Sequence, residues 1–480
     1  MLFNSYSFLV FFPIVVGLYF LLNPKLRWIL LLVSSYYFYM CWNVNYIILI
    51  FASTVIDYFA GIGIYRTSKK LNKFVLLSLS LISNLGILFT FKYYGFFSNA
   101  TENLLGVFNI AYHFPELDIL LPVGISFYTF QTLSYTIDIY RGITIPERHF
   151  GRFALYVSYF PQLVAGPIER SYQLLPQLRN FIDLNYSNVR DGLLLMTFGF
   201  FKKVVIADRL AEYVNLVYNN PGEYGGFSSL IATYFFSFQI YCDFSGYSDI
   251  AIGAALVMGV RLMTNFSQPY FSRNIGEFWS RWHISLSTWF RDYLYIPLGG
   301  NRVGKSRWYF NLLFVFVVSG LWHGAGWNFV IWGLLHGVYL VFTAILSNLG
   351  TGKNSLEKKR KSFPMHQLVQ IVFTFHLVLL GWVFFRANSF EDAKLILGSI
   401  LNFDIGVSGI NLFRFPVDFS LSIILIGTLM IIEYLQVYKN LNHRLASLPW
   451  VGKFSLLMVG IGSILLLGKF EGADFLYFQF

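Results

Sequence analysis

Apolar segments of membrane-spanning length follow one another along nearly the whole chain, and lipid permits very few folds. About 20 consecutive apolar residues are needed for a helix to cross the hydrocarbon core of a bilayer. Several segments are short or long for a single crossing, so we expect about 11 or 12 spans. They lie at 6–22, 28–42, 45–64, 74–92, 119–140, 191–218 and 227–260, twice within 309–346, and at 368–385, 419–437 and 455–468.

The composition agrees with a chain that is surrounded by lipid. Of its 480 residues, 56% are hydrophobic and 12% are charged, whereas about 25% are charged in an ordinary soluble domain. Since lipid cannot pair with backbone polar groups, each span must be a helix. The sequence therefore predicts an all-α multi-pass membrane protein. The first segment lacks a preceding basic region and a small-residue cleavage site, so we expect it to be retained as a helix.

One apolar segment does not fit a plain spanning helix. Residues 154–170 contain Pro161, Gly166 and Pro167, and proline removes a helical hydrogen bond. Irregular backbone is stable at membrane depth only where protein or a wet cavity surrounds it. We therefore predict a re-entrant or interfacial segment here.

Basic residues in the short loops predict the orientation, because cytoplasmic loops carry an excess of Lys and Arg. The loop at 66–73 has four basic residues, whereas 93–117 has none. Carrying the alternation along the chain places the N-terminus outside, and 261–308 and the linker 351–362 inside. The net charge of +11 is then explained by anchoring at the cytoplasmic face, and no nucleic-acid partner is implied.

The spans suggest a single membrane-embedded domain. We expect N-terminal spans at 1–150, a catalytic core at 151–346, a cytoplasmic linker at 347–367 and C-terminal spans at 368–480. The two cysteines, Cys41 and Cys242, both lie in apolar segments. They provide neither a disulfide framework nor a metal-binding pattern, so no metal site is predicted.

The first polar cluster is "QIYCDFSGYSDIAIG" at 239–253, within an apolar segment. Asp243 and Tyr247 are four residues apart and share a helical face, as do Ser245 and Asp249. Ionisable groups inside membranes usually face the bundle interior or a watery cavity, which makes them functional candidates. The alternative is a buried hydrogen-bond network that holds helices together where glycines allow close approach.

The second cluster is "FWSRWHISLSTWFRDYLYIPLGGNR" at 278–302. Its large apolar residues fall on one helical stripe, which predicts an amphipathic helix lying in the membrane interface. That interpretation explains the tryptophans and arginines but does not require His283. A second interpretation is that the remaining basic residues contact the phosphates of a cytosolic nucleotide-bearing donor.

The third cluster is "SGLWHGAGWNFVIWGLLHG" at 319–337. A histidine on an apolar helix is usually a packed core residue, and His376 is such a case in this chain. Residues 309–346 must cross twice, however, which leaves few residues for a turn, so "HGAGWN" predicts a broken helix. Backbone freed there needs polar partners, which places His323 at a hydrated cavity. A neutral imidazole can accept a proton near pH 7 and suits a general base.

These clusters, together with "PVGISFYTFQTLSYTIDIYRG" at 122–142 and "FPQLVAGPIER" at 160–170, resemble the membrane-bound O-acyltransferase family. They are most similar to its bacterial alginate O-acetyltransferase branch, and similar ends extend the resemblance over nearly the whole chain. The resemblance implies a ring of tilted helices around a central tunnel. The family's invariant histidine matches His323. Its second polar position, a histidine in this branch and often asparagine elsewhere, matches His283.

The resemblance also implies a mechanism. An acyl thioester, acetyl-CoA, would reach the site from the cytoplasm as a substrate, with no bound cofactor. His323 would take a proton from an acceptor hydroxyl, whose oxygen attacks the thioester carbonyl. His283 would orient the donor or hydrogen-bond the carbonyl as charge develops. An acyl-histidine intermediate and direct transfer both remain open. The substrate-binding candidates are Arg281, Trp282, Asp243, Tyr247 and Asn328.

In the family the acetyl group ends on an exported polysaccharide, with help from an extracytoplasmic SGNH-type or related partner. We therefore expect a multi-pass protein of the bacterial cytoplasmic membrane, acting with such a partner. Transfer of acetyl to peptidoglycan or of D-alanine to teichoic acid would use the same two histidines. A transporter would also show broken helices with intramembrane Asp and His residues, but the inverted repeat that would favour one is not evident.

Overall fold

Helices form every regular element that the structure describes. The structure is a computed structural model of the whole chain, and it describes all residues except 118, 182, 350–363, 403–415, 471–474 and 477–480. No strand occurs among the described residues, and the expected cytoplasmic linker at 351–362 lies outside them. The all-α fold class is confirmed.

The described residues divide into two compact units. The first comprises residues 1–196 and 247–263, and the second comprises 197–246 and 264–480. The sequence predicted a single domain made of N-terminal spans, a catalytic core, a linker and C-terminal spans. That organisation stays a prediction, and so does the central tunnel. Two helices, α10 (Tyr186–Phe200) and α12 (Gly226–Val257), run from one unit into the other.

The other elements of the first unit are α1 (Tyr6–Leu21), α2 (Arg27–Met40), η1 (Val44–Tyr46), α3 (Ile47–Arg66), α4 (Lys70–Leu88), η2 (Phe89–Tyr93), α5 (Tyr94–Val107), α6 (Ile125–Tyr140), α7 (Phe150–Ser158), α8 (Phe160–Leu163) and α9 (Ser171–Arg179).

Those of the second unit are η3 (Phe201–Ala207), α11 (Asp208–Tyr218), η4 (Pro269–Phe271), α13 (Ile275–Arg281), α14 (Ile284–Phe290), η5 (Arg291–Tyr295), α15 (Lys305–His323), α16 (Trp327–Leu349), α17 (Pro364–Arg386), α18 (Phe390–Asn402), α19 (Pro416–Lys439), α20 (Leu441–Ala446) and α21 (Trp450–Leu467).

Each expected span coincides with one of these helices or with a run of them. Six segments in the described part of the chain are long and apolar enough to cross a membrane, namely 44–66, 70–107, 327–346, 365–386, 416–439 and 450–467. The shorter α1 is also apolar. The multi-pass class is thus confirmed, while the count of about 11 or 12 spans stays a prediction. Helices such as α6 carry many polar residues that are buried against protein, and length and hydropathy alone do not identify these as spans.

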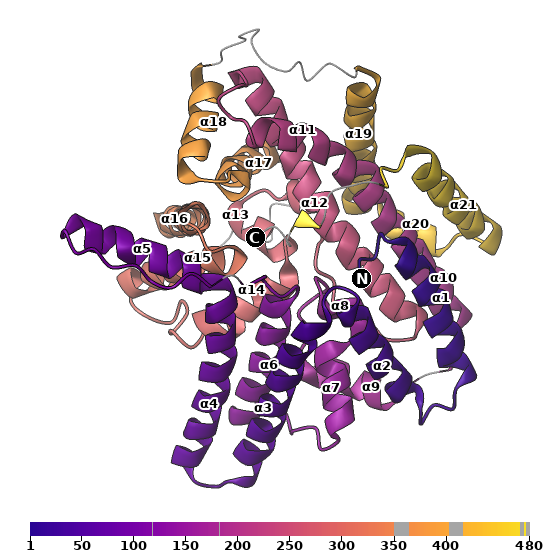
Figure 1. Cartoon of the computed structure of the whole chain (residues 1–480). Coiled ribbons are helices and arrows are strands. Elements are labelled where there is room, and N and C mark those ends of the chain that lie inside the picture. Colours follow the sequence, from indigo (N-terminus) through magenta and orange to yellow (C-terminus); the bar gives the residue numbers. More distant parts are fainter. Residues whose placement is uncertain (118, 182, 350–363, 403–415, 471–474, 477–480) are drawn as a thin grey trace. The chain divides into compact units, whose positions relative to one another are not determined.

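A buried carboxylate ties three helices of the first unit together. In Figure 1, α3, α4 and α6 lie side by side. Asp57 of α3 is fully buried and accepts hydrogen bonds from Ser80 and Asn84 of α4 and from Thr136 of α6. A buried polar group is tolerated when its hydrogen bonds are made, so this contact fixes the packing of the three helices.

A short π-helical segment bends the long apolar segment 70–107. Figure 1 shows α5 running at a wide angle to α4, and η2 lies between them. π-helical turns are a recognised cause of helix kinks. The expected span at 74–92 therefore ends at this bend, and α5 buries none of its residues.

The predicted irregular segment at 154–170 is confirmed as a break. Helix α7 ends at Ser158, α8 is one turn long, and residues 161–170 are all buried without regular structure after Leu163. A Cβ on Gly166 would lie 2.4 Å from the Cα of Gln162, so the backbone folds closely on itself there. Protein surrounds this irregular stretch, as its stability in an apolar setting requires.

Glycines let α10 and α12 approach at backbone contact in both units. A Cβ on Gly253 would lie 2.5 Å from the Gly192 carbonyl oxygen, and one on Gly246 would lie 2.7 Å from that of Gly199. Close packing at small residues is a common way to join helices in membranes. This supports the view that 239–253 holds helices together.

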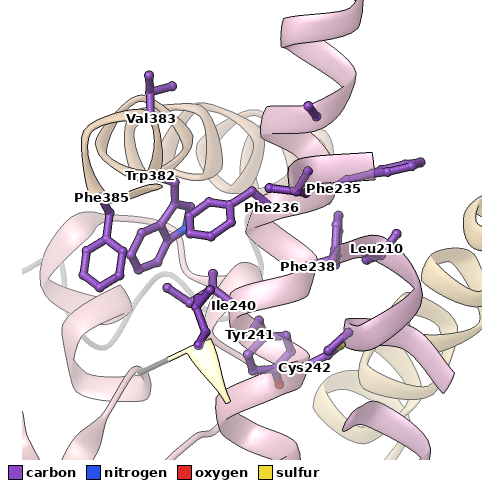
Figure 2. Close-up of a cluster of buried hydrophobic side chains, with 14 of the residues drawn as sticks. Leu210, Phe235, Phe236, Phe238, Ile240, Tyr241, Cys242, Trp382, Val383 and Phe385 are labelled. Carbon is purple, nitrogen blue, oxygen red and sulfur yellow. The ribbon is translucent and has the colours of Figure 1, made fainter. Parts of the chain in front are cut away.

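The core of the second unit is rich in aromatic side chains. Figure 2 shows Trp382 and Phe385 projecting from α17, with Phe236 of α12 beside Trp382. The Trp382 and Phe385 rings are 5.4 Å apart and the Phe236 and Trp382 rings are 6.3 Å apart, both edge to face. Aromatic pairs favour this geometry, and the cluster forms one wall of the candidate site described next.

Candidate active site

His323 lies at the break that the sequence predicted. It is the last residue of α15, and α16 begins at Trp327, so only three residues connect two antiparallel helices. The imidazole is 3% exposed. The break therefore positions a buried histidine at the end of a helix rather than in its middle.

Two glycines allow α15 and α16 to pack at backbone contact beside this turn. A Cβ on Gly320 would lie 2.2 Å from the Phe329 carbonyl oxygen, and a Cβ on Gly333 would lie 2.2 Å from that of Phe316. Only glycine fits both positions, because backbone atoms cannot move away as a flexible side chain can. The glycine pair therefore determines where the end of α15, and with it His323, is held.

Gly333→Ala is expected to destabilise the protein by more than the about 1–3 kcal/mol typical of an overpacked core, since the clash is with backbone. The thermal unfolding midpoint of the purified chain should fall, and acyl transfer should fall with it. Gly427→Ala on α19, where a Cβ would meet nothing within 4 Å, is the matched control. If both variants unfold at the wild-type temperature, the close contact at Gly333 does not exist.

Aromatic rings enclose the His323 imidazole. The ring centroids of Trp322 and Trp332 are each 5.0 Å away and that of Phe385 is 5.4 Å away, all edge to face. The His283 ring is 6.4 Å away. The structure thus brings together the two histidines that the sequence singled out, within a largely apolar enclosure.

His283 has a backbone conformation that few residues adopt. It precedes α14 with φ of 43° and ψ of 54°, in the left-handed region. Among residues other than glycine, Asn, Asp and His are enriched there, while most side chains cost roughly 1–2 kcal/mol. This requirement gives a physical reason why a histidine or an asparagine would occupy this position.

Asn265 fixes the orientation of the His283 ring. The Asn265 side-chain oxygen accepts hydrogen bonds from the backbone N–H of Ser285 at 3.2 Å and from its hydroxyl at 3.0 Å. The His283 Nδ1 lies 3.1 Å from the same oxygen, so Nδ1 must carry the hydrogen. His283 lies outside the helices of spanning length. Burial in protein lowers the pKa of its imidazole to about 3. The neutral ring therefore presents Nε2 as an acceptor.

The prediction of one amphipathic helix over 278–302 is wrong. Helix α13 ends at Arg281, and the left-handed His283 separates it from α14. The apolar stripe is largely buried in protein rather than lying in the membrane interface: Trp282 is 1% exposed, and its ring is 5.0 Å from that of Trp382. The apolar residues do recur at helical spacing. The chain nevertheless bends where Asn265 contacts residues 283–285, and the spacing of residues in the sequence does not reveal these contacts.

Three of the substrate-binding candidates make contacts within the protein. Arg281 pairs with Glu277 at 2.7 Å on the same helix. Trp282 packs in the aromatic core. Asn328 donates a hydrogen bond to the Ala387 carbonyl oxygen at 2.8 Å, which ties the start of α16 to the end of α17. Their binding of substrate stays a prediction.

Asp243 and Tyr247 fall in different units. Asp243 is buried in an ion pair with Lys203 at 2.6 Å and accepts a hydrogen bond from the Leu476 backbone N–H at 2.8 Å. Lys203 also contacts Asp208 at 2.8 Å. In the first unit, Tyr247 stacks on Phe3 with ring centroids 4.5 Å apart. These contacts favour the structural interpretation of the cluster, and a role in binding substrate stays a prediction.

The other histidines have defined surroundings. His336 is fully buried and accepts a hydrogen bond at Nδ1 from the Trp279 indole at 3.3 Å. Its ring is 5.1 Å from Trp332, which in turn contacts His323. His376 is exposed on α17 and lies 2.6 Å from the Tyr234 hydroxyl, so it has one polar neighbour that the sequence did not predict.

The site also contains residues that the sequence did not identify. Asn265 orients His283, and Phe385 contacts His323 from α17. Neither belongs to a recognisable pattern, because each is distant along the chain from the histidine that it contacts. The broken helix, the buried pair of imidazoles and the many apolar helices define a membrane-embedded protein of all-α class with a candidate site for proton-transfer chemistry.

Similarity to known proteins shows the family of this chain. The model of the membrane-bound O-acyltransferase family matches residues 144–387, and the chain belongs to this family. It is an O-acyltransferase. The chain is 38% identical to a "Probable alginate O-acetylase AlgI" of Pseudomonas putida over 100% of both proteins. It is 34% identical to a "Peptidoglycan O-acetyltransferase" of Helicobacter pylori over 100% of this chain and 98% of that protein.

A relative of lower identity is named for the transfer of a different acyl group. The chain is 28% identical to a "Teichoic acid D-alanyltransferase" of Bacillus subtilis over 58% of this chain and 72% of that protein. The names of these three relatives refer to acylation of alginate, peptidoglycan and teichoic acid.

Proposed function

We propose that the chain transfers an acetyl group from cytosolic acetyl-CoA for the O-acetylation of an exported polysaccharide. The observation that carries this proposal is the pair of buried histidines, 6.4 Å apart, in an O-acyltransferase. The alginate and peptidoglycan relatives described above match over the whole chain and are named for O-acetylation, whereas the D-alanyl relative matches 58% of it. Acetyl is therefore favoured over D-alanyl.

His323 acts as the general base in this proposal. Its imidazole takes the proton of an acceptor hydroxyl while the oxygen attacks the thioester carbonyl carbon. The carbon–sulfur bond then breaks, and the departing thiolate takes the proton back from the imidazolium. Charge is balanced at every step, and no metal or redox partner is needed. An acyl-histidine intermediate is the open alternative.

His283 orients the donor. The hydrogen on Nδ1 is directed at Asn265, so Nε2 can accept a hydrogen bond but cannot donate one while the ring is neutral. The pantetheine arm of CoA carries two amide N–H groups that match such an acceptor. This favours donor orientation over stabilisation of the developing oxyanion, the other role expected for this residue.

A cavity next to His283 supports entry of the acetyl donor beside this residue. It has a volume of about 390 Å³ and is bounded by α13, α14, η5 and α15. Ile284, next to His283, and Ser319, four residues before His323, both line it. Its wall is mostly apolar, with Arg291 and Ser287 among the polar groups. Arginine suits phosphate binding, so the CoA phosphates are assigned to the Arg291 side.

The bacterial relatives support a location in the bacterial cytoplasmic membrane, and the basic loops support an N-terminus on the outside. An extracytoplasmic SGNH-type partner would receive the acetyl group or pass it to the polymer. Single-cysteine labelling tests the orientation, with the exposed Cys41 replaced. Cysteine at Lys69 should react only from the cytoplasmic side and cysteine at Asn99 only from outside; labelling from one side for both would refute it.

Membrane vesicles of both orientations test the donor. Inside-out vesicles that contain the protein should consume added acetyl-CoA and release free CoA thiol, because this impermeant donor reaches the cytoplasmic face only there. Right-side-out vesicles should not. A D-alanyl thioester of a carrier protein is the competing donor. If the vesicles consume the D-alanyl thioester and leave acetyl-CoA unchanged, the transferred group is D-alanyl and not acetyl.

A further inference from the structure

A buried guanidinium at the end of α17 has only neutral side-chain partners. Arg386 is 6% exposed. Its Nη2 donates to the side-chain oxygens of Asn215 at 2.8 Å and Asn219 at 3.3 Å, and its Nη1 donates to that of Asn388 at 3.2 Å. Its Nε has no hydrogen-bond partner in the described part of the chain.

Two other buried cations of the same unit are paired with carboxylates, whereas the buried Lys453 donates to the backbone carbonyl oxygen of Ala446. Lys203 contacts two carboxylates, those of Asp208 and Asp243. Arg209, on α11 as Asn215 is, pairs with Asp418. No carboxylate lies within ion-pair distance of Arg386 among the residues that the structure describes. Burying a charge without a counter-ion is unfavourable, and proteins usually supply one.

The protein itself explains part of this arrangement. A cation at a helix C-terminus is stabilised by the helix dipole, and the Arg386 guanidinium lies 5.4 Å from the centre of the Tyr218 ring. Both effects favour a positive charge here. Neither neutralises it, nor do they occupy Nε, so one donor and the net charge remain for a ligand.

Two of the amide side chains that bind the guanidinium are exposed to the surface. Asn219 and Asn388 are exposed, while Arg386 is buried. Their oxygens accept hydrogen bonds from the charged guanidinium but carry no negative charge, whereas an oxyanion would accept the same bonds and also neutralise the guanidinium. An arriving oxyanion can therefore replace the amides by rotation of two surface side chains, with no change in the helices.

The residues on both sides of Arg386 contact the segment that carries the candidate base. The preceding residue, Phe385, has its ring 5.4 Å from that of His323. The following residue, Ala387, accepts the hydrogen bond of Asn328, which begins the helix after the histidine turn. An anionic group held at Arg386 would thus be fixed next to the segment that carries His323.

We propose that Arg386 is the subsite for an anionic group of the acceptor, a carboxylate or a phosphate, and that it positions the neighbouring hydroxyl for transfer. The planar fork of arginine suits bidentate binding of either oxyanion. This assignment rests on the proposed function, since it takes the acceptor to approach His323 along the end of α17. It predicts that a neutral saccharide is a poor ligand.

Binding to the purified full chain in detergent tests this without any turnover. The probes are a uronate oligosaccharide, the same oligosaccharide with its carboxyl groups reduced to alcohols, and polyglycerol phosphate. A ligand of the folded state raises the unfolding temperature. The wild type should be stabilised by at least one of the two anions and not by the reduced probe, and the effective anion tells whether carboxylate or phosphate is bound.

Arg386→Gln should weaken that binding by roughly 10- to 100-fold, the range expected for lost hydrogen bonds to a charged group. Arg386→Lys keeps the charge without the fork and should retain part of the shift. Arg209→Gln, which removes a buried arginine from the neighbouring helix, should start from a lower midpoint but keep the full shift.

An unchanged shift in Arg386→Gln, or no shift in the wild type with either anion, would overturn the proposal. Neither result bears on acetyl-CoA consumption in vesicles, which tests the proposed function by itself.

Discussion

His323→Gln is expected to reduce acyl transfer by roughly 10²–10⁴-fold, the usual contribution of a positioned general base. Glutamine can hydrogen-bond from the end of α15 but cannot take a proton. The Gly320 and Gly333 contact that holds this end does not involve the imidazole, so the protein should remain folded. Turnover of the thioester by equal amounts of purified wild type and variant measures the loss.

His376→Gln and His336→Gln are the controls for this result. His376 is exposed and contacts only the Tyr234 hydroxyl and a backbone carbonyl oxygen among its described polar neighbours, so most activity should remain. His336 accepts a hydrogen bond from Trp279 and packs on Trp332, so an intermediate loss through packing is expected. Near-normal transfer by His323→Gln would show that this residue is a structural hydrogen bonder and not the base.

Replacement of His283 with glycine is expected to raise the KM for the donor and to lower kcat/KM by roughly 10- to 100-fold, as for a lost hydrogen bond that fixes orientation. Glycine accepts the left-handed backbone without strain, so the loss can be attributed to the side chain. Alanine would add about 1–2 kcal/mol of backbone strain and is less informative. Steady-state kinetics with varied acetyl-CoA separates KM from kcat.

His283→Asn is the complementary variant. Asparagine tolerates the same backbone and keeps an acceptor oxygen, so it should retain much more activity than glycine. A loss in the asparagine variant as deep as that of His323→Gln would instead assign the proton transfer to Nε2 of His283. The two series together therefore decide which imidazole is the base.

The features of the site that the sequence predicted correctly are those that depend on residues close together in the chain. Glycines on both sides of His323 and the short distance available between two crossings required a break, and α15 ends at that histidine. The kink of 154–170 followed from its prolines in the same way. The helices themselves could be predicted because lipid leaves an apolar segment no other regular structure.

Long-range contacts could not be predicted. The left-handed His283 depends on Asn265, and its tautomer depends on the backbone N–H of Ser285. A periodic stripe over 278–302 suggested an uninterrupted helix, since spacing reports a local preference and not the bend that distant partners impose. The ion pair of Asp243 with Lys203 was hidden for the same reason, because the two residues lie on different helices.

The most direct measurement of the central claim is the ester-linked acetate that mild alkali releases from the envelope polysaccharide of the source cells. Deletion of the gene that encodes the chain should abolish this acetate, and the wild-type protein should restore it. The His323→Gln variant, present in the membrane in the same amount, should not restore it. Unchanged acetate after deletion, or restoration by His323→Gln, would contradict the assignment of an O-acetyltransferase with His323 as its base.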